Sequence, residues 1–184
     1  DLKKISKELD KVRNEFLVNK YELTNSKSKK ILHIANFNEN ADGRLFYSFA
    51  NKINTGFIKN NHVVDIISDR FYLKSNKSII NPFNDNIKFN NKILNTLKNF
   101  SPDVLLIGHV FNIDENVFSY CKEKNIKICS WYIDSISKEF LNSDKEKKFF
   151  NNLKYVDKCF ITSSPKLFKK HKFYNKLTFI PNPV

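Results

Sequence analysis

Two side chains capable of acid–base chemistry stand where apolar runs of the sequence end. His109 follows the run in "PDVLLIGHV", and Asp134 follows "IKICSWYI". An imidazole or a carboxylate at the end of a strand can take a proton from a substrate hydroxyl, or hydrogen-bond a sugar. We therefore predict Asp134 and His109 as the catalytic candidates. The alternative for a single histidine with no visible partner is a structural role.

Polar and aromatic side chains beside these two are predicted to bind substrate. Trp131 and Tyr132 carry flat amphipathic rings suited to a sugar or a nucleobase, although one of them must point into the packing of the sheet. Ser163 and Ser164 precede Pro165, where their default role is to cap a short helix and leave backbone N–H groups for an anion. The turn after "KILHIANF" is rich in groups that hydrogen-bond hydroxyls or carboxylates, namely Asn36, Asn38, Asp42, Gly43 and Arg44.

Several kinds of site lack their sequence pattern. A dinucleotide-binding turn needs G-x-G-x-x-G, and the turn after the first strand contains Gly43 alone. No Ser-His-Asp order, paired-carboxylate motif or metal-ligand cluster stands out. Three widely spaced cysteines, Cys121, Cys129 and Cys159, predict small buried residues in a reducing compartment. We expect no metal and no cofactor.

Composition narrows the class of protein further. The 184 residues are 41% hydrophobic, which suits a globular domain with its own core. The net charge of +13 arises from lysines spread along the whole chain, without a nucleic-acid motif, so we expect no nucleic-acid partner. No apolar run is long enough to cross a bilayer, and the first residues given, "DLKKISKELDK", lack the apolar core expected of a signal peptide. We expect a cytoplasmic protein, with peripheral contact at the inner membrane face left open by the basic surface.

Strand and helix patterns alternate along most of the chain. Short apolar runs predict strands at 30–35, 62–68, 101–110, 126–133, 157–164 and 177–181. Amphipathic segments between them predict helices within 42–61, with Asp42 as N-cap, and within 81–100, 112–125, 144–155 and 165–173. Continuous apolar strands alternating with helices indicate an α/β fold, a Rossmann-like doubly wound parallel sheet. Its ligands bind beyond the carboxyl ends of the strands.

The first residues form a separate segment. Leu2, Ile5, Leu9 and Val12 are spaced as in a heptad seam, which predicts an amphipathic N-terminal helix. This helix either pairs with a second copy, giving a homo-oligomer, or lies on the following domain. We assign 1–28 to this helix and its linker, and 29–180 to the Rossmann-like domain.

Three motifs together resemble the N-terminal half of a GT-B glycosyltransferase. "PDVLLIGH" resembles a Pro-Asp-Val strand that ends in His, and "VDKCFITSSPKLFKK" resembles an Ala-Asp strand that ends in Ser before a helix. "FIPNPV" resembles the Ile-Pro-Asn-Gly-Val-Asp crossover into the second domain, with Pro183 in place of Gly. The chain is most similar to the divergent bacterial CgeB-like, family-4-like nucleotide-sugar enzymes.

This resemblance implies a function for the chain. It implies the acceptor-side domain of a polysaccharide-forming glycosyltransferase, whose partners are a nucleotide sugar and a glycan acceptor. Residues 181–184 would begin the crossover to an absent donor-binding domain, so the chain alone would be inactive. Many retaining members carry Val-His-Asp where this sequence has Tyr132-Ile133-Asp134, which leaves retention or inversion open. Two alternatives remain: a non-catalytic binding or scaffolding module, and a sugar-nucleotide epimerase of the same architecture.

Overall fold

A six-stranded parallel sheet forms the centre of the computed structural model, which describes residues 27–75, 82–109, 112–134, 136, 144–169 and 172–181. The order of the strands is β2-β1-β3-β4-β5-β6, and every neighbouring pair is parallel. The strands are β1 (Lys30–Ala35), β2 (Val63–Ser68), β3 (Val104–Gly108), β4 (Lys127–Tyr132), β5 (Lys158–Ile161) and β6 (Leu177–Phe179). The predicted α/β, Rossmann-like doubly wound class is confirmed.

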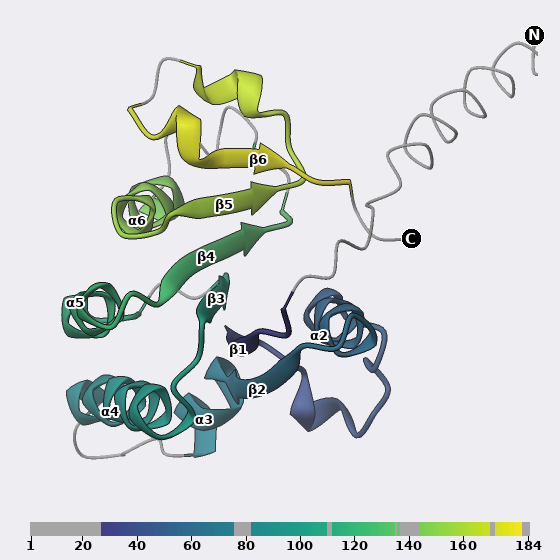
Figure 1. The fold of residues 1–184 in the computed structure, drawn as a ribbon, viewed down its shortest axis with the longest axis vertical. Helices are drawn as coiled ribbons and strands as arrows, with labels where there is room; N and C mark the ends of the chain where they lie inside the picture. Colours follow the sequence, from purple (N-terminus) through teal and green to yellow (C-terminus); the bar gives the residue numbers. More distant parts are fainter. Residues whose placement is uncertain are drawn as a thin grey trace, which may run out of the picture.

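Helices cover both faces of this sheet (Figure 1). On one face lies α2 (Phe49–Lys59), and on the other lie α4 (Pro82–Phe100), α5 (Glu115–Glu123) and α6 (Asp144–Leu153). Shorter elements are α3 (Asp69–Ser75) and the 3₁₀ turns η1 (Glu39–Ala41), η3 (Pro165–Phe168) and η4 (Tyr174–Lys176). The central strands are buried on both sides, which is why their sequences are continuously apolar rather than alternating.

Alternate residues of each strand enter one of two apolar cores. Leu32 and Ile34 of β1 belong to the larger core under α4, α5 and α6, while Ile31 and Ala35 pack with Ala50 of α2. The same alternation separates neighbouring residues of β4, because successive side chains of a strand point to opposite faces. It sends the two aromatic residues at the end of β4 into different cores.

The helix expected from Asp42 begins seven residues later, so this part of the prediction is wrong. Asp42 and Gly43 adopt positive φ angles of 49° and 79°, which interrupt a right-handed helix. Residues 42–47 form turns instead, and Ser48 is the N-cap of α2. The helix α3 directly after β2 was not predicted, and the helix predicted at Pro165 is the short 3₁₀ turn η3.

Aspartates of two of the three motifs that carry the family resemblance connect neighbouring strands at the amino edge of the sheet. The Asp103 carboxylate accepts a hydrogen bond from the Lys30 backbone N–H at 2.8 Å, and the Asp103 N–H donates to the Lys30 carbonyl. Asp157 makes the same two bonds with Ile128. These motifs therefore have a structural use in this chain, at the edge opposite the strand ends where ligands bind.

Some predictions concern residues outside the described part of the chain. The N-terminal helix within 1–26 and the crossover at 182–184 are among them. The helix, the pairing of two chains through it, and a second domain after residue 184 stay predictions.

Candidate functional site

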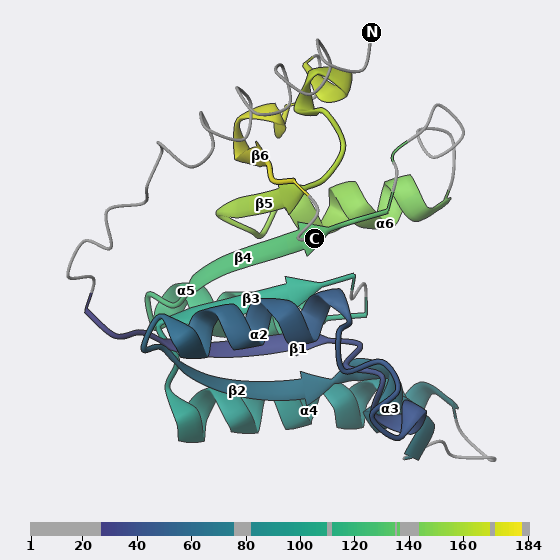
Figure 2. The ribbon, with the colours of Figure 1, turned by 90° about the vertical axis from the view of Figure 1, so that its right-hand side faces the viewer.

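A cavity of about 260 Å³ opens at the carboxyl edge of the sheet. Figure 2 shows the arrowheads of β1, β2, β3 and β4 pointing toward this edge, beside which α3 lies. The chain runs outward from β1 to β2 and then returns past β1 to β3, so the order of strands reverses between β1 and β3. Ligands of doubly wound sheets bind at such a switch point. The cavity is lined by Asn36, Asn38, Ser48, Phe49, Ala50, Arg70, Gly108, His109, Trp131, Ile133 and Asp134.

His109 and Asp134 lie side by side in this cavity. His109 follows β3 in the left-handed region, with φ of 54°, and this turn directs its ring toward β4. The His109 Nδ1 atom is 3.6 Å from Asp134 Oδ2, a contact slightly longer than a hydrogen bond. The Asp134 side chain is 61% exposed and the His109 side chain 25%. Their predicted proximity is confirmed, while their catalytic roles stay a prediction.

The hydrogen bonds of His109 determine what its ring can do. The Ile133 backbone N–H donates to His109 Nε2 at 2.9 Å, so Nε2 carries a lone pair and the neutral ring has its proton on Nδ1. That proton faces the Asp134 carboxylate. Because the one basic nitrogen is occupied by Ile133, His109 is placed to orient the Asp134 segment rather than to accept a substrate proton.

Trp131 belongs to a buried hydrogen-bonded row that the sequence did not indicate. Its Nε1–H donates to His33 Nε2 at 2.9 Å, and His33 Nδ1 lies 2.6 Å from Asn54 Oδ1. Since Nε2 accepts, Nδ1–H is the donor to Asn54. Burial lowers the pKa of His33 to about 4, although the bond to Asn54 acts in the opposite direction. His33 is therefore neutral near pH 7, and it holds the indole by an edge-on contact.

Gly108 is required by the position of this indole. A Cβ atom at residue 108 would lie 2.1 Å from Trp131 Cζ2 and 2.2 Å from Cε2, well inside van der Waals contact. Trp131 is only 6% exposed and packs against Phe49 of α2. The ring is therefore a wall of the cavity and not an open stacking platform.

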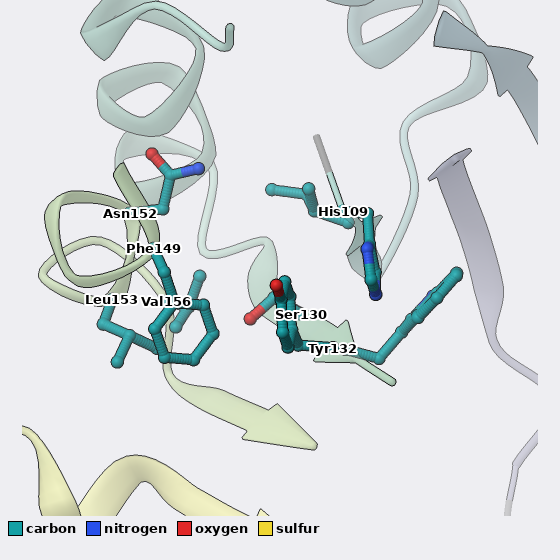
Figure 3. Close-up of a pocket in the computed structure, with 9 residues that line it drawn as sticks. His109, Ser130, Tyr132, Phe149, Asn152, Leu153 and Val156 are labelled. Carbon is teal, nitrogen blue, oxygen red and sulfur yellow. The ribbon is translucent and has the colours of Figure 1, made fainter. Parts of the chain in front are cut away.

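Tyr132 lies on the other face of the sheet, which corrects its expected role in substrate binding. Its ring stacks on His109 with centroids 4.3 Å apart, and it is 4% exposed. It lines a separate small cavity of about 20 Å³, together with Phe149, Asn152 and Leu153 of α6 (Figure 3). Burial, and secondly the charge of Asp134, raises the pKa of Tyr132 to about 12, so the phenol stays protonated. Tyr132 therefore packs against the His109 ring and does not face the cavity.

Besides Tyr132, five predicted binding residues do not line the cavity. Asp42, Gly43 and Arg44 lie on an exposed turn, where Arg44 Nε donates to the Ala41 carbonyl. The Ser163 hydroxyl accepts from the Ile136 N–H at 3.0 Å, and Ser164 is exposed and makes no side-chain cap. Ser163 therefore holds the segment that follows β4, while Ser164 is the N-cap residue of η3 through its backbone carbonyl, which accepts from the Leu167 N–H.

Asn36 and Asn38 do line the cavity, as predicted. The Asn36 side chain accepts from the Asn38 backbone N–H and donates to the Asn38 side-chain oxygen, both at 3.1 Å. Asn38 has φ of 57°, a conformation that asparagine tolerates better than most residues. The two amides thus stiffen the turn after β1 and present its polar edge to the cavity.

Arg70 and Ser48 line the cavity although they were not predicted to do so. Arg70 lies in the first turn of α3, and Ser48 precedes α2. The sequence around these two residues contains no binding motif. Their places at the cavity follow from where α2 and α3 begin, and neither start was predicted. Arg70 replaces Arg44 as the arginine of the site.

Metal ligands, membrane-spanning helices and cysteine pairs were considered for the described residues. Among them, no group of three His, Cys, Asp or Glu side chains is placed to hold a metal ion, and no helix has the length and apolar character needed to cross a membrane. The three cysteines are unpaired and at least half-buried, and burial raises the pKa of Cys121 and of Cys159 to about 12. These thiols are packing groups.

No protein-family model matches this chain, and no curated protein matches it. The resemblance to GT-B glycosyltransferases therefore remains an interpretation of motifs and fold.

Proposed function

We propose that this chain is the acceptor-side domain of a glycosyltransferase that uses a nucleotide-sugar donor. The observation that supports this most is Asp134, an exposed carboxylate at the switch-point cavity of a doubly wound sheet, with the His109 ring behind it. The order of the sequence motifs and the α/β class agree with the proposal. The nucleotide is assigned to a second domain, as in the fold that the sequence resembles.

In this proposal Asp134 acts as the general base. It takes the proton of an acceptor hydroxyl, the oxygen attacks the anomeric carbon of the donor sugar, and the bond from that carbon to the nucleotide phosphate breaks. His109 Nδ1–H orients the carboxylate, and Nε2 fixes the backbone of the next segment through Ile133. A base beside the acceptor is what inversion requires, whereas a retaining transfer depends more on donor phosphate contacts.

The test is a transfer assay on the product of the complete gene, with a panel of nucleotide sugars and the substitution Asp134→Asn. Asn keeps the shape of the side chain and removes its basicity, so we expect kcat to fall roughly 100-fold or more. Asp42→Asn is the matched control, because Asp42 is exposed outside the cavity, and it should stay within about twofold of the parent protein.

Other outcomes of this assay contradict the proposal in different ways. Unchanged turnover in Asp134→Asn removes this carboxylate from the mechanism. A free or altered nucleotide sugar as the product identifies an epimerase, and no reaction with any donor supports a non-catalytic binding module.

A further inference from the structure

The two charged residues that line the cavity have opposite signs and different surroundings. Asp134 has His109 beside it, whereas none of the ion pairs among the described residues involves Arg70. Arg70 is exposed, and its guanidinium offers five N–H donors in a planar fork. The adjacent Asp69 forms none of these ion pairs. Burial raises the pKa of its carboxyl group, while the backbone N–H and the charge of Arg70 act in the opposite direction. Arg70 thus brings to the cavity a positive charge that is not held in an ion pair among the described residues.

Two other groups of the lining add to the positive potential. Phe49 and Ala50 form the first turn of α2, where free backbone N–H groups give a helix end a partial positive charge. The hydroxyl oxygen of Ser48, the residue before that turn, is buried and has no hydrogen-bond partner among the described residues. An unpaired buried hydroxyl is costly, and a ligand in the cavity would supply the missing partner. These groups favour a ligand with an anionic end.

The other charged residue of the lining disfavours an anion. The Asp134 carboxylate repels negative charge and attracts a hydroxyl, and the Trp131 ring beside it gives an apolar wall. The volume of about 260 Å³ is below the range of roughly 300–1,000 Å³ typical of sites that enclose drug-sized ligands. The cavity therefore suits a single sugar unit with its anionic group toward Arg70 and a free hydroxyl toward Asp134.

We propose that the acceptor unit bound here is a sugar that carries an anionic group, a carboxylate or a phosphate, held by Arg70 and the first turn of α2 with a hydroxyl directed at Asp134. This assignment rests on the proposed glycosyltransferase function, because it names the acceptor class of the same site. It also gives Arg70 a role in specificity, since a neutral sugar leaves the guanidinium without a partner.

The experiment titrates the 184-residue chain, at constant ionic strength, with glucose, glucuronate, glucose 6-phosphate and inorganic phosphate. The single tryptophan gives one indole N–H resonance, which reports binding at the cavity wall. We expect glucuronate, glucose 6-phosphate or both to bind about tenfold or more tightly than glucose, as for a charge-assisted contact. The sugar acid and the sugar phosphate separate a carboxylate ligand from a phosphate ligand. Equal affinity for glucose, or no binding of any sugar, overturns the assignment.

Two arginine variants show whether the preference comes from the cavity. Arg70→Gln should bring the affinity for the anionic sugars to within about twofold of that for glucose. Arg44→Gln, on an exposed turn outside the cavity, should leave the preference unchanged. An equal loss in both variants would mean that the general basic surface attracts the anions, and the assignment would be wrong.

The outcomes for the two proposals are distinguishable. Failure of the titrations, with transfer activity intact, rejects an anionic acceptor but not the glycosyltransferase. Anion binding that depends on Arg70, in a protein without transfer activity, rejects the enzyme and keeps the binding site.

Discussion

His33 shows how one buried residue links the sheet, a helix and the cavity wall. It is fully buried in β1, accepts the Trp131 indole N–H and donates to Asn54 of α2. A protonated ring has no lone pair for Trp131, so protonation would break this row of hydrogen bonds. The neutral form is therefore part of the folded structure.

The first prediction is that stability falls as the pH falls from about 6.5 to about 4. The folded chain keeps His33 neutral down to the lower value, whereas the unfolded chain takes up the proton near the ordinary value of 6.5. The unfolded state binds more protons within this window, so acid favours unfolding, by roughly 3 kcal/mol at the low end. Urea unfolding at several pH values measures the change.

A pair of histidine variants isolates this contribution. His33→Gln should show a smaller loss over the window than the parent chain, while His62→Gln, at a partly exposed histidine outside the row, should keep the full loss. Identical pH dependence in the parent chain and His33→Gln would refute the assignment. An NMR titration of the His33 ring in the parent chain gives a direct check that does not depend on how well a variant folds.

At the scale of elements, the contact between β3 and β4 depends on the lack of a side chain at Gly108. Gly108 is paired with Trp131 across the two strands, and the indole lies over it. The ring can therefore reach His33, which lies beyond β3 on β1. The close approach fixes one wall of the cavity.

The second prediction compares two glycine substitutions. Gly108→Ala should destabilise the chain by about 2 kcal/mol or more, because the added methyl group displaces Trp131 and its hydrogen bond to His33. Gly56→Ala, in α2, meets no atom within 4 Å and should stabilise by about 0.5 to 1 kcal/mol, as alanine does within a helix. Denaturant unfolding measures both changes, and a loss of less than 0.5 kcal/mol in Gly108→Ala would contradict the packing argument.

The aspartates at the amino edge also act at this scale. Asp103 and Asp157 each join the start of a neighbouring strand through a side-chain and a backbone hydrogen bond. Both precede strands in motifs that resemble those of glycosyltransferases. The first N–H groups of a parallel strand need hydrogen-bond partners, and an aspartate at this position supplies one. The presence of these motifs therefore supports the fold more directly than the activity.

At the scale of the whole molecule, the described residues form one sheet with a small cavity at its carboxyl edge. A nucleotide sugar contains a base, a ribose, phosphates and a sugar, which exceeds a cavity of about 260 Å³. The turn after β1 has no glycine-rich cradle that could bind the phosphates. The cavity at the carboxyl edge thus has room for one part of such a donor.

The third prediction is that the 184-residue chain binds nucleotide sugars with dissociation constants of about a millimolar or weaker. Isothermal titration with a donor panel measures this, and the product of the complete gene should bind one donor at micromolar concentrations. Micromolar binding of a nucleotide sugar by the 184-residue chain would overturn its assignment as the acceptor side.

The sequence by itself determined the number of strands and their parallel direction. Six apolar runs separated by amphipathic segments require a covered parallel sheet, and parallel strands deliver their carboxyl ends to one edge. His109 and Asp134 each follow such a strand, which is why their proximity could be predicted without knowing the packing.

Only the tertiary structure decided how the side chains at that edge are used. The bond between Trp131 and His33 joins residues 98 positions apart, and no local pattern encodes it. Strand periodicity says that Trp131 and Tyr132 face opposite sides, but the packing of α2 and α6 decides which side each takes. Arg44 does not reach the cavity, because positive φ angles at Asp42 and Gly43 turn the chain before α2 begins. Arg70 reaches it from the first turn of α3, after β2. Such choices depend on contacts between elements distant in sequence, which form only when the sheet and its helices are assembled.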